Sequence, residues 1–452
     1  IDILLSEGVI DLAQADDAKA QALGVVARPG RVDGASPAFM DEVRAQLRRD
    51  YAPEDLNTVG LRVFTTLDPF VQARAEAICA EQLAHVERDT GTEPDTLQVG
   101  AVISDPQGGE LLAAVGGRQP GFAGYNRAIT LRRSIGSLAK PFVYLAALAT
   151  DRYDLSTVVS NDPLQVTLQN GDVWAPTNYT DVELGDMPVY RALAESINRP
   201  AVHVGLDVGI DAVARQFEAA LPDLEIPRYA SITLGALNLS PRQVAEMYAT
   251  LATGGDATPL RAVREVIDAQ GLPLKRYELR LRASADTADV VQVVGGMQVV
   301  MQRGTGRRAG AILPADMNVA GKSGSTNDYR DAWFAGFSAD RLAVVWVGRD
   351  DNAPTGLSGA RAALPIWAQL MRATAQVPYQ LPHSDEIQMQ TLDYTSGMLA
   401  DAGCDDTVLV PLPRDAELPP PAPCAGTSDR PGIKDTIEDR LLPWLRDRFT
   451  RD

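Results

Sequence analysis

Five lysines stand against thirty-seven arginines in this chain of 452 residues. An arginine side chain keeps its proton in proteins, whereas a lysine can lose its proton and become a neutral base. Lys140 is the one lysine with a serine three residues before it, in Ser137-Leu-Ala-Lys140. Positions three apart share one face of a helix, so this spacing places the amine near the Ser137 hydroxyl. We interpret the pair as a serine nucleophile with a lysine base.

The Ser137–Lys140 pair must meet an electrostatic condition. An ordinary lysine has a pKa of about 10.4, so removing its proton at pH 7 costs about 4.6 kcal/mol, at about 1.36 kcal/mol per pH unit. The net charge of −18 would push the pKa of Lys140 further up. The interpretation therefore requires burial of the amine, a second cation nearby, or both.

A second lysine lies in the stretch 321–325 (GKSGS), at the end of a strand-like pattern. Its glycines allow a substrate backbone to approach a strand edge closely. A lysine amine and two serine hydroxyls suit a carboxylate ligand. We expect this stretch to bind substrate through four residues: Lys322, Ser323, Gly324 and Ser325. Lys322 could also be the second cation that Lys140 requires.

A phosphate-binding loop is the competing interpretation of this stretch, because Gly-Lys-Ser also ends that motif. The motif would need a glycine at position 316, where the chain has Asp316. A carboxylate there would also repel phosphate, so we set this alternative aside.

The third candidate element is Ser196-Ile-Asn198. A hydroxyl and an amide two residues apart could relay a proton and hold a peptide carbonyl. Taken alone the pattern has little weight, because 325–327 (STN) has the same form and because such residues often cap helices.

The elements that must position these residues follow the order strands, a helical block, then strands again. Residues 61–66 predict a strand, 68–88 a helix that Asp68 caps, and 99–115 a β-hairpin. A helix is expected over about 137–150, a mostly helical block over 183–310, and three further strands at 318–325, 332–338 and 342–347. This order indicates an α+β fold in which the hairpin and the late strands share one antiparallel sheet.

Composition narrows the functional classes. The charge of −18 argues against nucleic acid as a partner. The histidines at 85, 203 and 383 are far apart, so we expect neither a metal site nor a cofactor. Cys79 lies in a helical pattern and should be buried, whereas Cys404 and Cys424 bracket a proline-rich segment and could form a disulfide in an oxidising compartment. No apolar run is long enough to span a membrane.

The two ends of the chain differ from the middle. Residues 1–60 predict a helical segment, with an apolar face around residues 3–12, that leads into an extended connection. Residues 411–424 (PLPRDAELPPPAPC) predict a proline-rich linker. Residues 433–449 predict an amphipathic helix that Pro443 would kink.

Together, S-x-x-K, S-x-N and a lysine–hydroxyl–glycine motif occur here in the order found in serine β-lactamases and penicillin-binding proteins. The chain resembles the transpeptidase part of class A (bifunctional) penicillin-binding proteins, nearest the 1B type, over about residues 55–375. Six stretches carry the likeness: 122–127 (FAGYNR), 132–141 (RRSIGSLAKP), 234–239 (LGALNL), 302–306 (QRGTG), 331–336 (DAWFAG) and 346–350 (WVGRD).

The resemblance implies a five-stranded antiparallel sheet flanked by helices on both faces, with a large helical subdomain. It assigns catalytic roles to Ser137, Lys140 and Ser196, and substrate binding to Asn198, Lys322, Ser323, Gly324 and Ser325. It also implies that the backbone N–H groups of Ser137 and Ser325 form the oxyanion hole. The serines at 323 and 325 depart from the commoner threonine but keep the hydroxyl, so we expect function to survive, with altered antibiotic affinity at most.

The resemblance further implies an activity and its partners. Ser137 would be acylated by a D-Ala-D-Ala stem peptide of peptidoglycan, and an amine of a neighbouring stem peptide would then form the cross-link. β-Lactam antibiotics would acylate the same serine. Residues 1–60 would be the last helix and linker of a glycosyltransferase domain, 61–375 the transpeptidase domain, and 376–452 a C-terminal extension.

The full-length parent would lie at the periplasmic face of the inner membrane, anchored by an N-terminal transmembrane helix that this chain lacks. It would polymerise glycan, which this fragment should not, and would bind other cell-wall synthesis proteins and an outer-membrane activator. Three alternatives stay open: a β-lactamase or DD-carboxypeptidase that uses water as acceptor, a β-lactam sensor, and an inactive scaffold.

Overall fold

The structure is a computed structural model that describes residues 1–20, 36–58, 60–167, 171–179 and 184–426. The chain divides into two compact units, residues 1–35 and 36–452. The first unit contains α1 (Asp2–Ser6) and α2 (Leu12–Ala20). The apolar face expected here is largely exposed, with Ile3 76% and Leu12 64% accessible. No helix in the described part of the chain has the length and apolar character needed to cross a bilayer.

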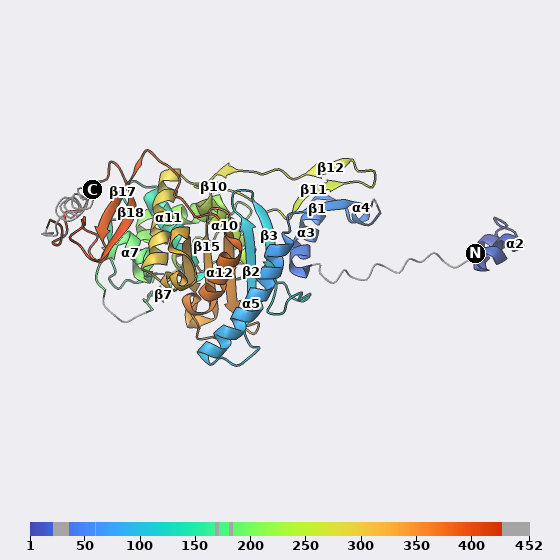
Figure 1. Ribbon diagram of the computed structural model, residues 1–452, viewed down its shortest axis with the longest axis horizontal. Helices are drawn as coiled ribbons and strands as arrows, with labels where there is room; N and C mark the ends of the chain where they lie inside the picture. Colours follow the sequence, from blue (N-terminus) through green and yellow to red (C-terminus); the bar gives the residue numbers. More distant parts are fainter. Residues whose placement is uncertain (21–35, 59, 168–170, 180–183, 427–452) are drawn as a thin grey trace, which may run out of the picture. The chain divides into compact units, whose positions relative to one another are not determined.

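A five-stranded antiparallel sheet lies at the centre of the second unit (Figure 1). Its strand order is β14-β15-β16-β2-β3, so β14 is an edge strand. The prediction of one sheet built from the hairpin and the late strands is therefore confirmed. The strands are β2 (Gln98–Asp105), β3 (Glu110–Val115), β14 (Ala320–Ser325), β15 (Asp331–Phe337) and β16 (Leu342–Gly348).

Helices cover both faces of this sheet, which confirms the predicted fold class. The helices α5 (Pro69–Thr90) and α12 (Gly359–Thr374) pack together on one face, and α10 (Pro241–Ala252) packs on the other (Figure 1). Every residue of β15 and β16 is buried, because side chains that alternate between the faces meet a helix on either side. Asp68 caps α5 as predicted, accepting hydrogen bonds from the N–H groups of Phe70 and Val71.

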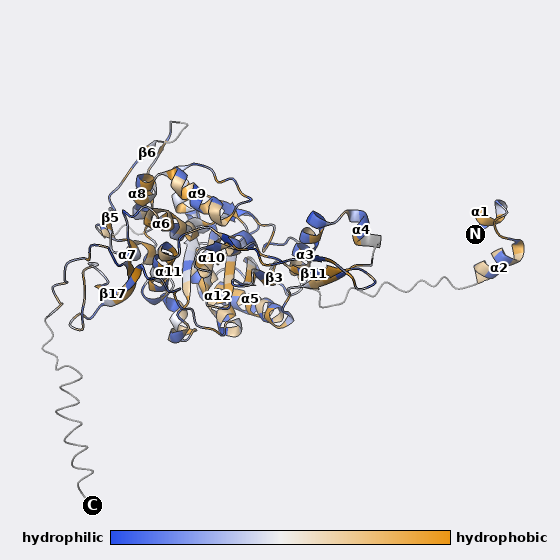
Figure 2. Cartoon of the chain, turned by 90° about the horizontal axis from the view of Figure 1, so that it is seen from above, coloured by the Kyte–Doolittle hydropathy of each residue, from blue (hydrophilic) through white to orange (hydrophobic). Residues whose placement is uncertain are grey.

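A helical subdomain lies beside the edge strand β14, where α11 packs against β14 and α7. Hydrophobic and hydrophilic residues alternate within single helices such as α9, which buries Val213 and Phe217 (Figure 2). The helices of this subdomain are α6 (Lys140–Leu148), α7 (Val189–Ala194), α8 (Asn198–Val208), α9 (Ile210–Ala220) and α11 (Thr287–Gln302). Five 3-10 turns accompany them in the described chain: η1 (Gly136–Ala139), η2 (Ala230–Leu234), η3 (Arg307–Ala311), η4 (Ala315–Met317) and η5 (Asn327–Tyr329).

The expectation of helix across residues 183–310 is wrong between 256 and 283, where the chain forms strands. The predicted strand at 61–66 is present as β1 (Arg62–Thr65), and it pairs with β11 (Val263–Ile267), which pairs in turn with β12 (Pro273–Arg276). The β-branched residues of β11 favour a strand, and Gly271 with a φ of +86° allows the turn that follows. Short strands complete the structure: β4 (Arg133–Ser134), β5 (Val158–Val159), β6 (Val166–Thr167), β7 (Val173–Trp174), β8 (Met187–Pro188), β9 (Asn238–Leu239), β10 (Asp256–Ala257) and β13 (Arg282–Ala283).

The expected extended connection before residue 60 is instead helical over α3 (Pro37–Asp50) and α4 (Pro53–Thr58). The helix α3 docks through buried polar side chains. The Gln46 amide oxygen accepts hydrogen bonds from the N–H groups of Ala262 and Val263, at 2.9 and 3.2 Å. Glu42, one turn earlier, is buried and faces a largely buried arginine of α10.

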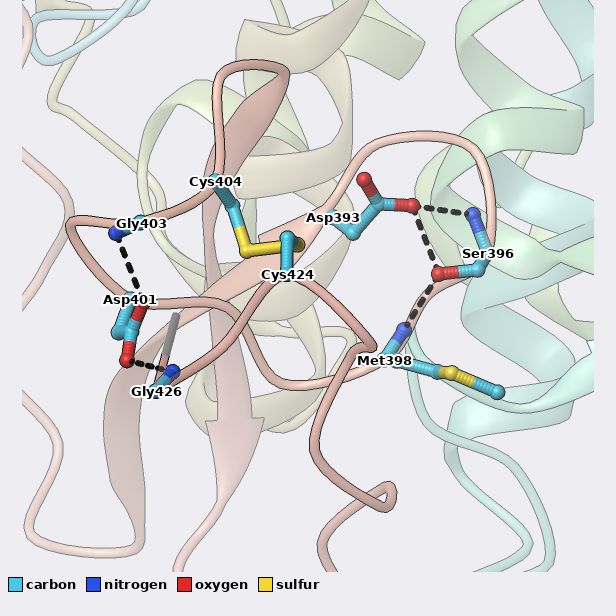
Figure 3. The surroundings of a disulfide bond; sticks show 8 residues. All are labelled: Asp393, Ser396, Met398, Asp401, Gly403, Cys404, Cys424 and Gly426. Carbon is cyan, nitrogen blue, oxygen red and sulfur yellow. Dashed lines mark hydrogen bonds between the residues drawn. A yellow bond between two sulfur atoms is a disulfide. The ribbon is translucent and has the colours of Figure 1, made fainter. Parts of the chain in front are cut away.

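The segment after residue 376 forms a hairpin of β17 (Ile387–Asp393) and β18 (Thr407–Pro413). The predicted linker from 411 therefore begins inside a strand. A disulfide joins Cys404 to Cys424, and the Asp401 carboxylate accepts hydrogen bonds from two backbone N–H groups beside it (Figure 3). Cys79 is buried in α5, as expected. The helix predicted at 433–449 lies outside the described residues.

Candidate active site

Ser137 lies in the 3-10 turn η1, immediately before the α-helix that begins at Lys140. The serine is 5% exposed. Two buried side chains fix this turn to the rest of the domain. The Tyr248 hydroxyl of α10 donates to the Leu138 carbonyl at 2.9 Å, and the Trp333 indole of β15 donates to the Ser134 carbonyl at 2.9 Å. The nucleophile candidate is therefore held from both the helical side and the sheet.

Close backbone contacts press η1 against the edge of the sheet. Gly136 has a φ of +54°, and a Cβ atom there would lie 2.3 Å from the Ser325 carbonyl oxygen. A Cβ atom on Gly235 would lie 1.9 Å from the Gly136 carbonyl oxygen, and one on Gly324 would lie 2.6 Å from the Ile135 carbonyl oxygen. Only glycine fits such distances, so these positions bring the backbone at Ser137 next to β14.

The Lys140 side chain is fully buried among neutral oxygens. Its Nζ donates hydrogen bonds to the Ser196 carbonyl at 2.5 Å and to the Asn198 amide oxygen at 2.7 Å. The Ser196 hydroxyl lies 3.4 Å away, and within the described chain none of the amine's hydrogen bonds goes to Ser137. Burial lowers the pKa of Lys140 well below its ordinary value, and the nearby charge of Lys322 lowers it further. The electrostatic condition for Lys140 to act as a base, burial of the amine with a second cation nearby, is therefore met.

The middle motif is not a helix cap, the alternative that its pattern had left open. The helix α8 begins at Asn198 after Ile197, with no side-chain capping bond. Ser196 instead occupies a left-handed conformation, with a φ of +60° that costs a non-glycine residue energy. This conformation brings its carbonyl oxygen to Lys140 and its hydroxyl to Lys322.

Lys322 of β14 is the second fully buried amine. Its Nζ donates to the Ser196 hydroxyl at 2.8 Å and to the Ser323 carbonyl at 2.9 Å. Burial lowers the pKa of Lys322 to about 7. The Ser196 hydroxyl thus lies between the two lysines, which joins the three predicted motifs in one polar cluster.

The remaining predicted residues line the same edge strand. The Ser323 hydroxyl donates to the Thr305 hydroxyl at 2.7 Å, whereas the Ser325 hydroxyl accepts from the Gly359 N–H at 3.0 Å. Gly324 packs beneath η1, on the side of the Leu138 side chain. The strand therefore contributes hydroxyls on both sides of Gly324.

Two residues that hold this site were not predicted from the sequence. Thr305 accepts a hydrogen bond from the Ser323 hydroxyl. The loop that holds it runs close to the Ser196 segment, because Gly304 lacks a Cβ atom, which would lie 2.1 Å from the Ala194 carbonyl. The sequence feature that could have indicated Thr305 is its position between two glycines in residues 302–306. Tyr248 gave no signal, because a tyrosine inside an amphipathic helix is ordinary core.

Comparison with known proteins identifies the class of this site. The family model of the penicillin binding protein transpeptidase domain matches residues 99–372. The chain therefore belongs to the penicillin-binding protein transpeptidase family, a family of serine transpeptidases of peptidoglycan synthesis.

Relatives of the 1B type, which the sequence motifs indicated, align with most of this chain. The chain is 34% identical over 427 residues to penicillin-binding protein 1B of Vibrio cholerae and 36% identical over 407 residues to that of Escherichia coli K12. These alignments cover 94% and 89% of this chain but 52% and 48% of the relatives. The chain thus spans about half the length of the curated relatives it matches.

Solved structures share the fold. Penicillin-binding protein 1A from Haemophilus influenzae superposes with a TM-score of 0.76 at 19% identity, over 93% of this chain and 81% of that one. The PonA1 protein from Mycobacterium tuberculosis, solved in complex with penicillin V, gives a TM-score of 0.66 at 25% identity, over 77% and 96% of the two chains. The predicted transpeptidase fold is therefore confirmed.

Proposed function

We propose that this chain is a peptidoglycan DD-transpeptidase that is acylated on Ser137 by a D-Ala-D-Ala stem peptide. One observation carries the proposal: two fully buried lysines, without a carboxylate among their hydrogen-bond partners in the described chain, share the hydroxyl of Ser196. Burying an unpaired ammonium is costly, so the arrangement favours an uncharged amine. An uncharged lysine one turn after a serine can act as its base.

The hydrogen bonds of Lys140 suit this role. A neutral amine has two N–H bonds and one lone pair. Its two short hydrogen bonds go to the Ser196 carbonyl and the Asn198 amide oxygen, which account for both N–H bonds. The lone pair is then available to take the proton of the Ser137 hydroxyl as its oxygen attacks the substrate carbonyl.

The edge of β14 would hold the substrate during acylation. The developing oxyanion would accept hydrogen bonds from the backbone N–H groups of Ser137 and Ser325, and such donors are typically worth about 3 kcal/mol each. The terminal carboxylate would pair with Lys322 and the hydroxyls of Ser323 and Ser325. A bound carboxylate raises the pKa of Lys322 above its unliganded value of about 7 and holds the amine in its charged form.

The reaction has two halves that balance in protons. In the first, an ester forms between the Ser137 oxygen and the carbonyl carbon of the penultimate D-alanine, and the amide bond between the two D-alanines breaks. The departing amine of the terminal D-alanine takes the proton that Lys140 removed, relayed through the Ser196 hydroxyl. In the second, an amine of a neighbouring stem peptide attacks the acyl-enzyme and returns a proton to Ser137. A β-lactam would open its ring in the first half and remain on the serine.

A labelling experiment tests this assignment. Replacing Ser137 by alanine should abolish covalent labelling by a fluorescent penicillin and the added acyl mass seen by intact-mass spectrometry. Ser384→Ala, before β17, is the matched control and should label as the unaltered protein does. Labelling of the Ser137→Ala chain at another residue would reject the proposal.

The acceptor is tested separately, with peptidoglycan fragments as substrate. Cross-linked dimers are the expected product. Trimmed monomers without dimers would instead favour a carboxypeptidase that uses water, and a substrate that is never released would favour a sensor.

For the full-length parent we propose a place at the periplasmic face of the inner membrane, with a glycosyltransferase activity and cell-wall partners, including an outer-membrane activator. The likeness to 1B-type proteins supports this placement. The Cys404–Cys424 disulfide also fits an oxidising compartment outside the cytoplasm.

A further inference from the structure

The outer edge of β14 ends in a contact that the proposed reaction does not use. The Thr326 N–H bonds to the Asp331 carbonyl on the β15 side, and adjacent residues of a strand point their backbone groups to opposite sides. The N–H and C=O of Ser325 therefore both face away from the sheet. The Tyr179 hydroxyl donates to this outward carbonyl of Ser325 at 2.9 Å.

Tyr179 is held in place from two directions. The residue before it, Asn178, accepts hydrogen bonds from the N–H groups of Asn198 and Arg199 at 3.1 Å each, which ties this segment to the middle motif. On the other side, the Tyr179 ring lies 5.8 Å from the ring of Tyr329, centre to centre. Tyr179 therefore connects the Asn198 segment to the end of β14.

The backbone that presents Tyr329 is strained. Asp328 and Tyr329 both have positive φ values, of 58° and 51°, which non-glycine residues adopt at a cost. The Tyr329 carbonyl accepts hydrogen bonds from the N–H and the hydroxyl of Thr355, which hold that conformation. The tyrosine pair is thus a fixed feature of the strand end.

We propose that the Tyr179 hydroxyl competes with the substrate for the Ser325 carbonyl, and that this competition makes Tyr179 a specificity-determining residue. The inference rests on the proposed function, in which the Ser325 N–H binds the oxyanion. A substrate residue that places its carbonyl on this N–H presents its own amide N–H to the carbonyl of Ser325, as in a hydrogen-bonded pair of antiparallel strands. Tyr179 must release that carbonyl first.

The competition slows ligands that have an acylated amine next to the scissile carbonyl, because only these ligands displace the tyrosine hydroxyl. A stem peptide and an acylamino β-lactam both have an amide N–H there, which replaces the lost tyrosine hydrogen bond. A ligand without that donor leaves the Tyr179 hydrogen bond in place, so its binding does not depend on the hydroxyl. The Tyr179 contact therefore ranks ligands by a group that does not react.

The test uses Tyr179→Phe, which keeps the ring and removes the hydroxyl. The second-order rate constant of acylation is measured with benzylpenicillin, which has an acylamino N–H, and with a penam that bears only hydrogen at the same ring carbon. Tyr179→Phe should accelerate benzylpenicillin about fivefold, the effect of one neutral hydrogen bond, and should leave the unsubstituted penam unchanged. Tyr229→Phe, at a tyrosine 54% exposed against 47% for Tyr179, is the control and should change neither rate.

Each other result overturns the inference. Equal acceleration of both penams would show that the hydroxyl hinders ligands through its size rather than through its hydrogen bond. Slower acylation by benzylpenicillin would show that the hydroxyl assists binding. No change with either ligand would show that the carbonyl is not contested. Failure of the proposed function has a different signature, because it is seen as labelling that persists in the Ser137→Ala chain.

Discussion

Two buried clusters of charged residues lie in the same domain and have opposite composition. In the candidate site, the hydrogen-bond partners of Lys140 and Lys322 in the described chain are hydroxyl, carbonyl and amide oxygens. At the junction of α3 and α10, Arg242 meets two carboxylates instead. Its Nη1 lies 3.0 Å from Glu246 and its Nε 3.1 Å from Glu42.

The pKa values follow this difference. Burial lowers the pKa of both lysines, and their hydrogen-bond partners among the described residues include no anion that would offset the loss of hydration. Burial acts on Arg242 as well, but the charges of Glu246 and Glu42 outweigh it and raise its pKa. The pKa of Glu246 is raised by burial in spite of Arg242. A buried cation with anionic partners is thus a structural link, whereas a buried lysine without them is prepared for proton transfer.

The largest effect is expected from Lys140→Arg, because arginine is also a basic side chain but does not lose its proton in a protein. If the unpaired cluster works by proton transfer, acylation by penicillin should fall by about 10²–10⁴-fold, the usual contribution of a general base. The measurement is the second-order rate constant of acylation at pH 7.

Lys275→Arg is the matched control, because Lys275 is partly exposed and paired with Asp50 at 2.6 Å. It should acylate as the unaltered chain does. Near-normal acylation by Lys140→Arg would show that Lys140 is no base, and the contrast between the clusters would then have no catalytic meaning.

Disrupting the cluster of Arg242, Glu42 and Glu246 should lower the free energy of unfolding rather than the acylation rate. Arg242→Met leaves the buried Glu42 and the largely buried Glu246 without their cation, and breaking a buried ion pair in this way typically costs about 3–5 kcal/mol. Denaturant unfolding measures the loss, while acylation per folded molecule should stay close to normal.

Arg276→Met removes an exposed arginine that pairs with Glu265 and should alter stability far less. If Arg242→Met were no worse than Arg276→Met, the α3–α10 cluster would not be a structural link.

The candidate site residues named from the sequence lie near one another in the structure, but their geometry was not predicted. The spacing of Ser137 and Lys140 predicted that the amine lies near the hydroxyl, but in the described chain the hydrogen bonds of Lys140 go to Ser196 and Asn198. The left-handed Ser196 was beyond prediction, since its conformation is imposed by partners 56 and 126 residues away in sequence. Thr305 and Tyr248 likewise reach the site only through the tertiary fold.

The fold was likewise predicted where local sequence patterns determine it and missed where distant contacts do. The central sheet was predicted because its strands are apolar runs bounded by turn residues. The helix α3 was missed because the positions it buries include Glu42 and Gln46, whose polar side chains break the apolar pattern. The position of α3 depends on contacts with Arg242 and with the backbone of residues 262 and 263, which no local sequence pattern reveals.

The smallest effect, and the finest test of the contrast, is the pH dependence of stability. The pKa of Lys322 is about 7 in the folded chain and ordinary, about 10.4, when unfolded. Between these values the unfolded state binds more protons, so the free energy of unfolding should rise with pH, by at most about 1.4 kcal/mol per unit for this group. Below pH 7 its contribution flattens, because the amine is then charged in both states.

Lys322→Met isolates this contribution, and denaturant unfolding at pH 7, 8 and 9 measures it. The variant should be more stable than the unaltered chain at pH 7, and the difference should shrink toward pH 9 because a neutral amine costs less to bury. Arg242→Met should show no such convergence, since an arginine stays charged throughout this range. A difference for Lys322→Met that stays constant from pH 7 to 9 would mean that Lys322 titrates outside this range, and the two buried clusters would then not differ as argued.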